Sequence, residues 1–587
     1  MRIEPPYVLL DDARDGGAPA RLYRHPRAVV EAHDASEIAP MLAAVRAHTT
    51  DQRGAAAGFL SYEAAGAFEA AAVTSREIDG PLGWFGLFDG YDTVDVPALL
   101  PDAAGAWIGA LEPRVSRADY HSMFAHVQAL IAAGDLYQAN LTFRADMDVA
   151  GDPLALYARL RGATRGGWGA VVATGRQTFL SFSPELFFAL EGDRLTCRPM
   201  KGTAPRLSDP HADQAAAAAL AQDPKQRAEN LMIVDLMRND LSRVAVAGSV
   251  AVPELFALEH YPTVHQMTST VTATRRRGVD AVDVLSALFP CGSITGAPKL
   301  RAIQALSEIE ADARGVYTGA IGRIDASGDA MFNVAIRTLT LSADGERATI
   351  GLGGGIVADS TAVAEWDEAL AKGAFLASGD RRFDLIETMA FDPMEGIALV
   401  ERHLSRLKDS AAALGFAFDR HDTRNELQAA TFRLREASRV RMLLARSGAV
   451  SIQVSRMPPA RAAPLKVALV PLPVSPRDWR LRHKSSDRAF YDDARRRSGS
   501  DEMVFALPDG TLTEGSYTSL FVERDGVLLT PPAGALLPGV LRAELLETGR
   551  AREAILRAED LRGGFLLGNA LRGLMPARLA RDHLAVA

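Results

Sequence analysis

The sequence predicts a mixed α/β fold arranged in more than one domain. Segments with apolar residues at helical spacing alternate with short glycine- and aromatic-rich segments typical of buried strands, and the residue pattern changes near Ser378–Arg382. A chain of 587 residues gives a prior of about four domains of roughly 150 residues, and fewer, larger α/β domains fit it as well. We expect two domains, 1–378 and 383–587.

The composition predicts a soluble cytoplasmic protein. Lys and Arg total 65 against 73 Asp and Glu, a net charge of −8 with both signs interspersed, so a nucleic-acid partner is not expected. The start, Met1–Pro6, lacks a basic region followed by an apolar run, and the sequence has no uncharged apolar stretch long enough for a membrane span. Cys197 and Cys291 show no pairing or zinc-like spacing, which suits a reducing compartment.

The first elements can be placed from local pattern. Glu37–His48 is predicted to be helical, and Gly58–Glu63 and Gly83–Phe88 are predicted to be buried strands instead of an aromatic binding stripe. Ser116 and Asp119 form a plausible capping pair for the helix that follows. That helix is expected to end at Gly134 and to lead into a strand. Its apolar positions and the strand are Tyr120, Phe124, Val127, Ile131 and Tyr137–Thr142.

The stretch Arg198–Thr203 is predicted to form the centre of the functional site in the first domain. Lys201 stands between Pro199 and Gly202, where the backbone can approach a ligand and a partly desolvated amine can act as a nucleophile. Most single lysines beside a turn are solvated surface charges. The functional interpretation depends on four further motifs, in this order: Ser181–Glu185, Arg227–Asp240, Cys291–Lys299 and Gly353–Ser360.

Together these motifs resemble the chorismate-utilising enzymes, which include anthranilate, aminodeoxychorismate, isochorismate and salicylate synthases. The resemblance covers roughly residues 1 to 378 and implies a two-layer sandwich. Isochorismate and salicylate synthases carry a water-activating lysine at the position of Gln138, and glutamine cannot act as that base. Anthranilate synthases carry alanine at the position of Lys201, whereas aminodeoxychorismate synthases carry lysine. The resemblance therefore implies amination of chorismate to 4-amino-4-deoxychorismate, with anthranilate synthesis as the alternative.

The same resemblance assigns catalytic roles to two residues. Lys201 would add at C2 of chorismate as the 4-hydroxyl leaves, and ammonia would then enter C4 while the lysine departs. Glu185 would protonate the leaving hydroxyl. A strand-end carboxylate that faces water is the alternative for Glu185.

Three acidic residues are predicted to hold Mg²⁺ in this domain. Chorismate carries two carboxylates, so an acidic protein needs concentrated positive charge to bind it. Mg²⁺ supplies this charge with one or two protein carboxylates, waters and substrate oxygens. Glu229 is one candidate, and by resemblance Glu368 is a direct ligand and Glu365 a nearby or water-mediated one.

The helices that carry these acids can also be outlined. Lys372 lies four residues beyond Glu368, so it shares a helix face with Glu365 and is expected to face a substrate carboxylate. An ordinary surface ladder of Glu and Lys has the same spacing. On the Glu229 helix, the expected core positions are Leu231, Val234 and Leu241.

Several further residues are candidates for binding the substrate. Pro298 is expected in the first turn of a helix whose free amides could bind a carboxylate. Arg337 is predicted to lie in an alternating strand, Phe332–Leu339, opposite Val334 and Ile336. Gln266 stands where many relatives carry histidine, with His265 beside it. The complete set of predicted substrate-binding residues is Gln138, Thr295, Gly296, Tyr317, Arg337, Gly353, Gly354 and Lys372.

A second pattern begins after residue 382. Its motifs are Phe383–Met389, Glu401–Leu407, Arg482–Lys484, Thr513–Ser516 and Leu536–Arg542. They resemble the fold-type IV pyridoxal-phosphate enzymes, which include branched-chain and D-amino-acid aminotransferases and aminodeoxychorismate lyase. The resemblance implies pyridoxal 5′-phosphate as cofactor, bound covalently by Lys484. A basic run such as Arg480–Lys484 is more usual on a solvated surface, and its fixed relation to the Thr513–Ser516 motif favours the functional interpretation.

The other cofactor contacts follow from the same resemblance. Arg406 would hold the phosphate, Glu514 would pair with the pyridinium nitrogen, and the turn at Ser516 could offer amides to the phosphate. Leu541 stands where a threonine is often present.

The combined prediction is a bifunctional enzyme of 4-aminobenzoate formation for folate synthesis. The second domain would release pyruvate from the aminated product and aromatise the ring, with Lys484 moving the proton. Ammonia is expected from a separate glutamine amidotransferase, since neither cysteine lies in a recognisable nucleophile motif. Dimerisation of the C-terminal domain is compatible with this prediction. The alternatives are an anthranilate synthase component I fused to an aminotransferase, a synthase with an inactive C-terminal domain, and a catalytically inactive scaffold that regulates a glutaminase.

Overall fold

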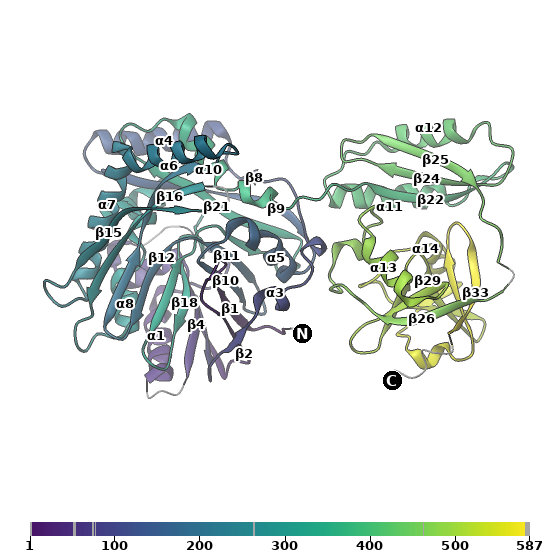
Figure 1. Ribbon diagram of the computed structural model, residues 1–587, viewed down its shortest axis with the longest axis horizontal. Helices are drawn as coiled ribbons and strands as arrows, with labels where there is room; N and C mark the ends of the chain where they lie inside the picture. The colour runs from purple at the N-terminus through teal and green to yellow at the C-terminus, as the bar shows by residue number, and fades with distance from the viewer. Residues whose placement is uncertain are drawn as a thin grey trace. The chain divides into compact units, whose positions relative to one another are not determined.

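The computed structural model describes residues 3–50, 54–72, 76, 78–261, 264–461 and 463–580 (Figure 1). The chain forms two compact units. The first unit comprises residues 1–100, 111–149 and 157–379, and the second comprises 101–110, 150–156 and 380–587. Two short segments that precede residue 378 therefore belong to the second unit. Met1, Arg2 and the last seven residues, 581–587, lie outside the described part.

The first unit contains two large antiparallel sheets. The first sheet has the strand order β17(Gly296–Ala297), β9(Gln138–Ala150), β21(Arg347–Ile356), β20(Thr338–Leu341), β11(Thr178–Ser183), β10(Trp168–Ala173), β1(Tyr7–Asp11), β2(Ala20–Arg24) and β6(Asp92–Val94). The second has the order β14(Met200–Pro205), β16(Val264–Thr274), β13(Arg194–Arg198), β12(Leu186–Glu191), β19(Ala330–Val334), β18(Ala320–Ile324), β4(Ala55–Leu60), β5(Gly83–Phe88) and β3(Ala28–Ala32), with β15(Ala251–His260) paired to β16.

The two sheets share one apolar core, which makes the first unit a sandwich. Tyr23 and Phe179 from the first sheet lie in one buried cluster with Phe59, Trp84 and Phe88 from the second. Alternate residues of a strand point to opposite faces, so each sheet contributes every second side chain to this layer. The two-layer sandwich and the buried strand at Gly83–Phe88 are confirmed. The strand predicted over Gly58–Glu63 ends at Leu60, and a short 3₁₀ helix begins at Tyr62.

Helices cover the sandwich and carry much of the first candidate site (Figure 1). The predicted capping box of Ser116 and Asp119 is present, and the predicted helix at 37–48 is also confirmed. On the Glu229 helix, Val234 and Leu241 are buried as expected, but Leu231 is 51% exposed. The prediction for Leu231 was wrong because the buried stripe runs through Ile233 and Met237. The longer helices are α1(Ala35–Thr49), α4(Arg117–Ala132), α5(Pro153–Thr164), α6(Pro210–Gln222), α7(Pro224–Ser242), α8(Ala281–Leu288), α9(Lys299–Ile309) and α10(Ala362–Ala371), and the short ones are α2(Ala65–Phe68) and α3(Val96–Leu99).

The strand predicted over Phe332–Leu339 is not continuous. Strand β19 ends at Val334 in the second sheet, and β20 begins at Thr338 in the first. The chain changes sheet between them, and Arg337 takes a left-handed backbone conformation with φ of 49°. The prediction was wrong because an alternating pattern does not reveal that a strand is cut by a crossover. Pro298 likewise lies just before α9, not inside its first turn.

The second unit combines two sheets. The smaller has the order β23(Gly396–Ile397), β22(Leu385–Asp392), β24(Ser438–Leu444) and β25(Val450–Arg456), with α11(Val400–Ala413) packed on β22 and α12(Arg420–Thr431) on β25. The larger has the order β28(Leu512–Gly515), β27(Glu502–Ala506), β26(Leu465–Pro471), β33(Gly573–Leu579), β32(Phe565–Asn569), β29(Ser519–Arg524), β30(Val527–Thr530) and β31(Ala551–Glu553). Because β28 also pairs with β29, the strands from β28 to β29 close into a ring.

Two helices of the second unit flank the larger sheet. They are α13(Ala489–Ser498) and α14(Val540–Glu547), and the short 3₁₀ helix η7(Trp479–Leu481) precedes the lysine motif. Within the described residues of the whole chain, the helices fall short of the length and apolar character that a membrane crossing requires.

Candidate active sites

Lys201 lies in an irregular part of β14. The pairing of β14 with β16 shifts between Met200 and Thr203, and Gly202 between them has φ of 96°. Gln266 secures this irregularity, since its amide donates to the Gly202 carbonyl at 2.8 Å and its oxygen accepts from the Thr203 hydroxyl at 3.0 Å. Gln266 therefore fixes the backbone on which Lys201 stands.

The Lys201 ammonium group is removed from bulk water among other ionisable groups. Burial lowers the pKa of Lys201, the charge of Lys372 lowers it further, and Glu229 and Glu185 act in the opposite direction. Gly355 of β21 leaves the space for this arrangement. A Cβ added at Gly355 would lie 2.3 Å from Gln138 Nε2 and 3.2 Å from Lys201 Nζ. Gln138, Lys201 and Gly355 therefore meet at one point.

Glu185 is a buried acid beside this lysine. It is 3% exposed, in the tight connection between β11 and β12, and burial raises its pKa to about 7. A hydrogen bond with Ser293 and the charge of Lys201 act in the opposite direction. Glu185 Oε1 is buried without a hydrogen-bond partner among the described residues. A carboxyl group with these properties can hold a proton near neutral pH and deliver it to a ligand.

The three predicted metal ligands gather on α7 and α10. Glu365 Oε1 accepts from the Ser360 hydroxyl at 2.6 Å, and Lys372 Nζ lies 2.9 Å from Glu368 Oε1. Desolvation raises the pKa of Glu229, and the charges of Glu365 and Glu368 raise it further. The three carboxylates are therefore close enough to repel one another.

These carboxylates also border the glycine strand β21. Lys372 Nζ donates to the Gly353 carbonyl at 2.8 Å, and a Cβ added at Gly354 would lie 3.1 Å from Glu365 Oε2. The glycines allow the acids of α10 to approach the backbone of the strand. On this face Glu365 is buried against the strand, whereas the Lys372 and Glu368 side chains pair with each other and stay 40% and 59% exposed.

The donor set fits Mg²⁺ only if substrate and water complete its coordination. In the part of the chain that the structure describes, no group of three or more His, Cys, Asp or Glu residues has the spacing of a ready metal cage. Mg²⁺ characteristically takes one or two protein carboxylates and keeps other oxygen ligands from water and substrate. Carboxylates that repel one another beside a partly buried lysine are suited to that mode of binding.

The remaining predicted substrate residues divide into two groups. Gly296 pairs with Ala139 beside Gln138, and the Thr295 hydroxyl donates to the Gly292 carbonyl at 2.9 Å, so Thr295 secures the turn before α9. Tyr317 is buried under β21, where a Cβ at Gly351 would lie 2.0 Å from its ring.

Arg337 stands apart from the lysine cluster. Burial lowers its pKa, and the group that interacts with it electrostatically is Tyr261. The described contacts therefore do not bring Arg337 into the group formed by Lys201, Glu185 and the acids.

The second candidate site is a cavity of about 520 Å³ in the second unit. Lys484, Arg406, Glu514 and Ser516 all line it, so the structure brings the predicted cofactor residues together. Burial lowers the pKa of Lys484 to about 7, which leaves a large share of its amine neutral near pH 7. Lys484 is therefore not the solvated surface charge that its basic sequence run suggests.

A buried acid orients Arg406 at this cavity. Glu387 accepts from Arg406 Nε at 2.9 Å and from Arg406 Nη2 at 2.6 Å, and it also contacts His403 Nδ1 at 2.6 Å. Burial alone would raise the pKa of Glu387, but the Arg406 charge and the His403 hydrogen bond outweigh it and hold that pKa well below its usual range. Sequence reasoning assigned no role to Glu387 or His403. One sequence signal could have indicated His403: it lies one helical turn before Arg406 on α11, so the two side chains share a helix face.

Glu514 presents one carboxylate oxygen to the cavity. Both the Tyr491 hydroxyl, at 2.7 Å, and the Leu537 amide, at 3.0 Å, donate to Oε1, which leaves Oε2 for another donor. Burial raises the pKa of Glu514 to about 8. Ser516 differs, because its amide and hydroxyl both donate to Glu502 Oε1, at 3.1 and 2.7 Å. Its polar groups support the loop and are not directed to the cavity.

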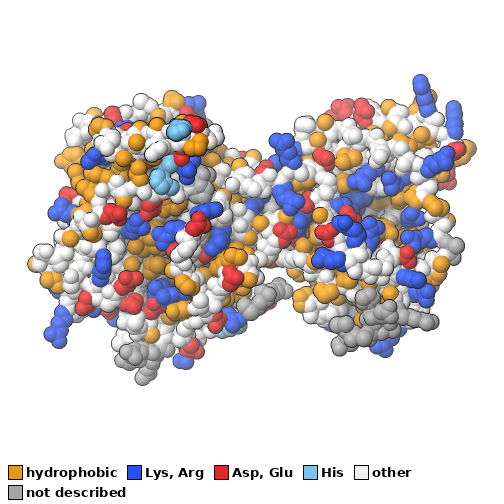
Figure 2. Space-filling view, viewed as in Figure 1, with side chains coloured by type: hydrophobic (Ala, Val, Ile, Leu, Met, Phe, Trp, Pro, Cys, Tyr) orange, Lys and Arg blue, Asp and Glu red, His pale blue; other side chains and the backbone are white. Residues whose placement is uncertain are grey.

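This second set of residues fits pyridoxal 5′-phosphate. A cavity of about 520 Å³ has the size usual for small-molecule sites, and a partly neutral lysine, an oriented arginine and a buried carboxylate line it together. Further cationic side chains surround the cavity, including Arg439, Arg441, Arg488 and Arg495. Lys and Arg side chains also gather on the visible face of the second unit (Figure 2). The charge favours an anionic ligand.

Comparisons with known proteins match two families to consecutive parts of the chain. The family model described as chorismate binding enzyme matches residues 5–378, and the model described as amino-transferase class IV matches residues 384–580. Both resemblances inferred from the sequence are thereby confirmed.

Similar proteins give further detail for the first match. The chain is 40% identical over 343 residues to aminodeoxychorismate synthase component 1 of Salmonella typhimurium, which covers 54% of this chain and 75% of that protein. The protein of the same description from Escherichia coli is 44% identical over 261 residues, which covers 44% of this chain and 57% of that protein. Among solved structures, anthranilate synthase component I from Streptococcus pneumoniae has a TM-score of 0.53 at 24% identity and covers 64% of this chain and 93% of its own. That likeness concerns the fold.

Proposed function

Because the chain belongs to the chorismate binding enzyme family over residues 5–378, we propose that the first unit aminates chorismate to 4-amino-4-deoxychorismate. The observation that carries this proposal is the pair of Lys201 and Glu185, a partly buried amine and a buried acid that interact electrostatically. The similarity to two aminodeoxychorismate synthase components supports it. Ammonia would be supplied by a separate glutamine amidotransferase.

The proposed chemistry requires a deprotonated amine at Lys201 and a protonated carboxyl group at Glu185. Lys201 must be neutral to attack C2 of chorismate, and burial lowers its pKa in that direction. Glu185 must carry a proton to give to the 4-hydroxyl as the C4–O bond breaks, and burial raises its pKa to about 7. Ammonia then forms the C4–N bond, the C2–N bond to Lys201 breaks, and the lysine leaves as the free amine.

The product of the first unit distinguishes this proposal from its nearest alternative. We expect the purified chain, given chorismate, Mg²⁺ and ammonium, to release aminodeoxychorismate or its aromatised product, 4-aminobenzoate. Chromatography with authentic standards separates this para isomer from anthranilate, the ortho isomer. Predominant anthranilate would overturn the proposal. No turnover at all would favour a catalytically inactive scaffold.

We propose further that Glu229 and Glu368 are needed for Mg²⁺-dependent amination. When bound, Mg²⁺ would supply the positive charge that an acidic protein needs to hold a substrate with two carboxylates. The residues that would hold it are Glu229 and Glu368, with Glu365 nearby and fixed by Ser360.

Glu229→Ala and Glu368→Ala should each lower amination by a factor of about 10² or more, since metal-site carboxylates are seldom replaceable. Turnover of supplied aminodeoxychorismate by the second unit should stay within about twofold of the wild type. As a matched control, Glu401→Ala removes an exposed acid paired with Arg420 in the second unit and should change neither activity. Loss of the second activity in the Glu229 and Glu368 variants would contradict independent sites.

For the second unit we propose elimination of pyruvate from aminodeoxychorismate to give 4-aminobenzoate. When bound, pyridoxal 5′-phosphate supplies an electron sink for the carbon that loses a proton. Lys484 would bind the cofactor and move the proton, Glu514 would face the ring nitrogen, and Arg406 would face the phosphate. The match to the class IV family supports a pyridoxal-phosphate enzyme and leaves the reaction type to experiment.

A keto-acid acceptor separates lyase from aminotransferase activity. Given purified aminodeoxychorismate without any keto acid, the chain should release 4-aminobenzoate and pyruvate in equal amounts over many turnovers, because elimination returns the cofactor to its starting state. Product analysis with and without added keto acid makes the measurement. If turnover requires the keto acid and transfers the amino group to it, the second unit is an aminotransferase.

A further inference from the structure

The second unit contains a segment that the sequence pattern places in the first domain. Residues 101–110 belong to the second unit, although they lie inside the 5–378 match. Trp107 of this segment is 3% exposed and packs in the buried cluster that includes Leu385, Phe416 and Trp479. The segment therefore contributes to the core of the unit that contains Lys484.

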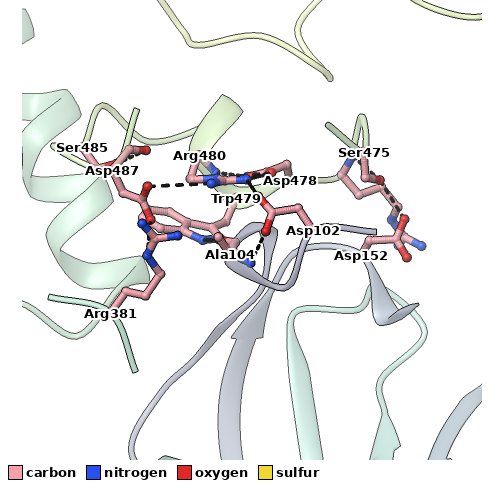
Figure 3. Close-up of polar contacts among 11 residues, drawn as sticks. Asp102, Ala104, Asp152, Arg381, Ser475, Asp478, Trp479, Arg480, Ser485 and Asp487 are labelled. Atoms are coloured by element: carbon pink, nitrogen blue, oxygen red, sulfur yellow. Dashed lines mark hydrogen bonds and ion pairs between the residues drawn. The ribbon is translucent and has the colours of Figure 1, made fainter. Parts of the chain in front are cut away.

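The same segment supplies one acid to a charge cluster around Arg480 (Figure 3). The Arg480 side chain is 4% exposed and donates to Asp478 from Nε, at 3.0 Å, and from Nη2, at 2.6 Å. Nη2 also donates to Asp102 Oδ2 at 2.9 Å, and Nη1 lies 3.7 Å from Asp487. A buried guanidinium needs such partners because an unpaired buried charge is costly.

Further contacts tie residues 101–110 to the turn that contains Arg480. Trp479 Nε1 donates to the Ala104 carbonyl at 2.9 Å. Asp478 caps the short helix η7 through the Arg480 amide at 2.9 Å. Gly105 lies so close that an added Cβ would be 2.6 Å from Asp478 Oδ2. The close approach requires glycine at this position.

The Arg480 turn leads directly into the lysine loop. Lys484 follows Arg480 by four residues, and its carbonyl accepts from the Ile386 amide at 2.8 Å. On the far side of Lys484, Asp487 interacts with both Arg480 and Arg381. The backbone that carries Lys484 is thus held between strand β22 on one side and the Arg480 cluster on the other.

We propose that residues 101–110 position Lys484, with Asp102 and Gly105 acting through Arg480 and Asp478. Neither Asp102 nor Gly105 lines the cavity, so both are positioning residues and not catalytic ones. A loop held at both ends keeps the amine at a fixed place, and a misplacement of about 1 Å costs on the order of 10²-fold in rate. This inference rests on the proposed cofactor site at Lys484.

Two substitutions in the full-length chain test the proposal. Asp102→Asn keeps an oxygen that can still cap the Ala104 amide but removes the charge that faces Arg480. Gly105→Ala adds a methyl group where the Asp478 carboxylate lies. We expect both variants to lose the pyridoxal absorbance band faster than the wild type during gel filtration. The expected acceleration is about threefold to tenfold for Asp102→Asn, because a half-exposed ion pair contributes less than a buried one and an ordinary hydrogen bond contributes about 0.5–1.5 kcal/mol. It should be larger for Gly105→Ala.

Each variant has a matched control in the first unit. The Asp92 side chain is 51% exposed and pairs with Arg24 at 2.7 Å, while the Asp102 side chain is 52% exposed. Gly90 has open space around an added Cβ. Asp92→Asn and Gly90→Ala should leave the band and its rate of loss unchanged. Restored cofactor retention in Asp102→Glu, which keeps the charge, would show that the charge is what matters.

The outcomes separate this inference from the proposed function. A wild-type chain without a pyridoxal band would refute both. A normal wild-type band with wild-type retention in Asp102→Asn and Gly105→Ala overturns the positioning role alone. A parallel loss of chorismate amination in these variants would show that residues 101–110 serve general stability, which also overturns the inference.

Discussion

Replacing Lys484 by alanine should abolish 4-aminobenzoate formation from aminodeoxychorismate and eliminate the covalently bound form of the cofactor. The expected loss of rate is several orders of magnitude, because in the proposed function one side chain would both bind the cofactor and move the proton. Its pKa of about 7 allows the amine to serve in both protonation states near neutral pH. The measurement combines the absorbance spectrum, borohydride trapping followed by peptide mass analysis, and the rate of pyruvate release.

The matched control is another lysine of the same unit. Lys466 is exposed at the start of β26, so Lys466→Ala should retain the spectrum and the rate. Chorismate amination by the first unit provides an internal control for the folding of the Lys484 variant. If borohydride still labels the Lys484→Ala chain and pyruvate release continues at the wild-type rate, the assignment of Lys484 fails.

Lys201→Ala should remove most aminodeoxychorismate formation while leaving the second activity intact. Loss of a nucleophile commonly lowers the rate by several orders of magnitude, unless direct attack by ammonia at C4 provides a bypass. Some chorismate could then be diverted to anthranilate-like products. The assay is chorismate consumption with ammonium and Mg²⁺, with the products separated by chromatography.

Lys201→Arg distinguishes a nucleophile from a positive charge. Arginine keeps the charge but stays protonated, so it should be as inactive as alanine. Near-normal turnover in Lys201→Arg would show that Lys201 acts by charge alone.

The pH dependence of amination tests Glu185. Activity of the wild type should fall as pH rises through about 7, because Glu185 donates a proton only in its neutral form.

The sequence predicted what depends on local pattern and on ordered motifs. The capping box at Ser116 and the buried strand at Gly83–Phe88 follow from short-range chemistry, and both are present. The break before Arg337 could not be predicted, because the residues alternate on both sides of a crossover between sheets. The exposure of Leu231 on α7 was also not predicted. Helical spacing identifies the buried face of a helix only when several apolar positions are considered together.

In the candidate sites, too, the sequence motifs indicated the key residues but not the distant residues that surround them. Motif order indicated Lys201, Glu185 and Lys484, but their burial arises from segments distant in sequence. Gly355 packs against Gln138 and Lys201 across more than 150 residues of chain. The orientation of Arg406 depends on Glu387, an acid that stands in a different motif. Such partners are set by tertiary packing, which no single motif encodes.

The position of Trp107 in the core of the second unit has a consequence for how this gene could be divided. A chain cut at residue 379 would leave the tryptophan with the other polypeptide. A tryptophan buries roughly 150–250 Å², worth about 4 to 6 kcal/mol of apolar burial, against a net stability of only about 5–15 kcal/mol for a typical domain. The separated second fragment would expose an apolar gap at Leu385 and Trp479 and would tend to aggregate. A split of the gene at this boundary would therefore destabilise the second unit, which favours keeping both units in one polypeptide.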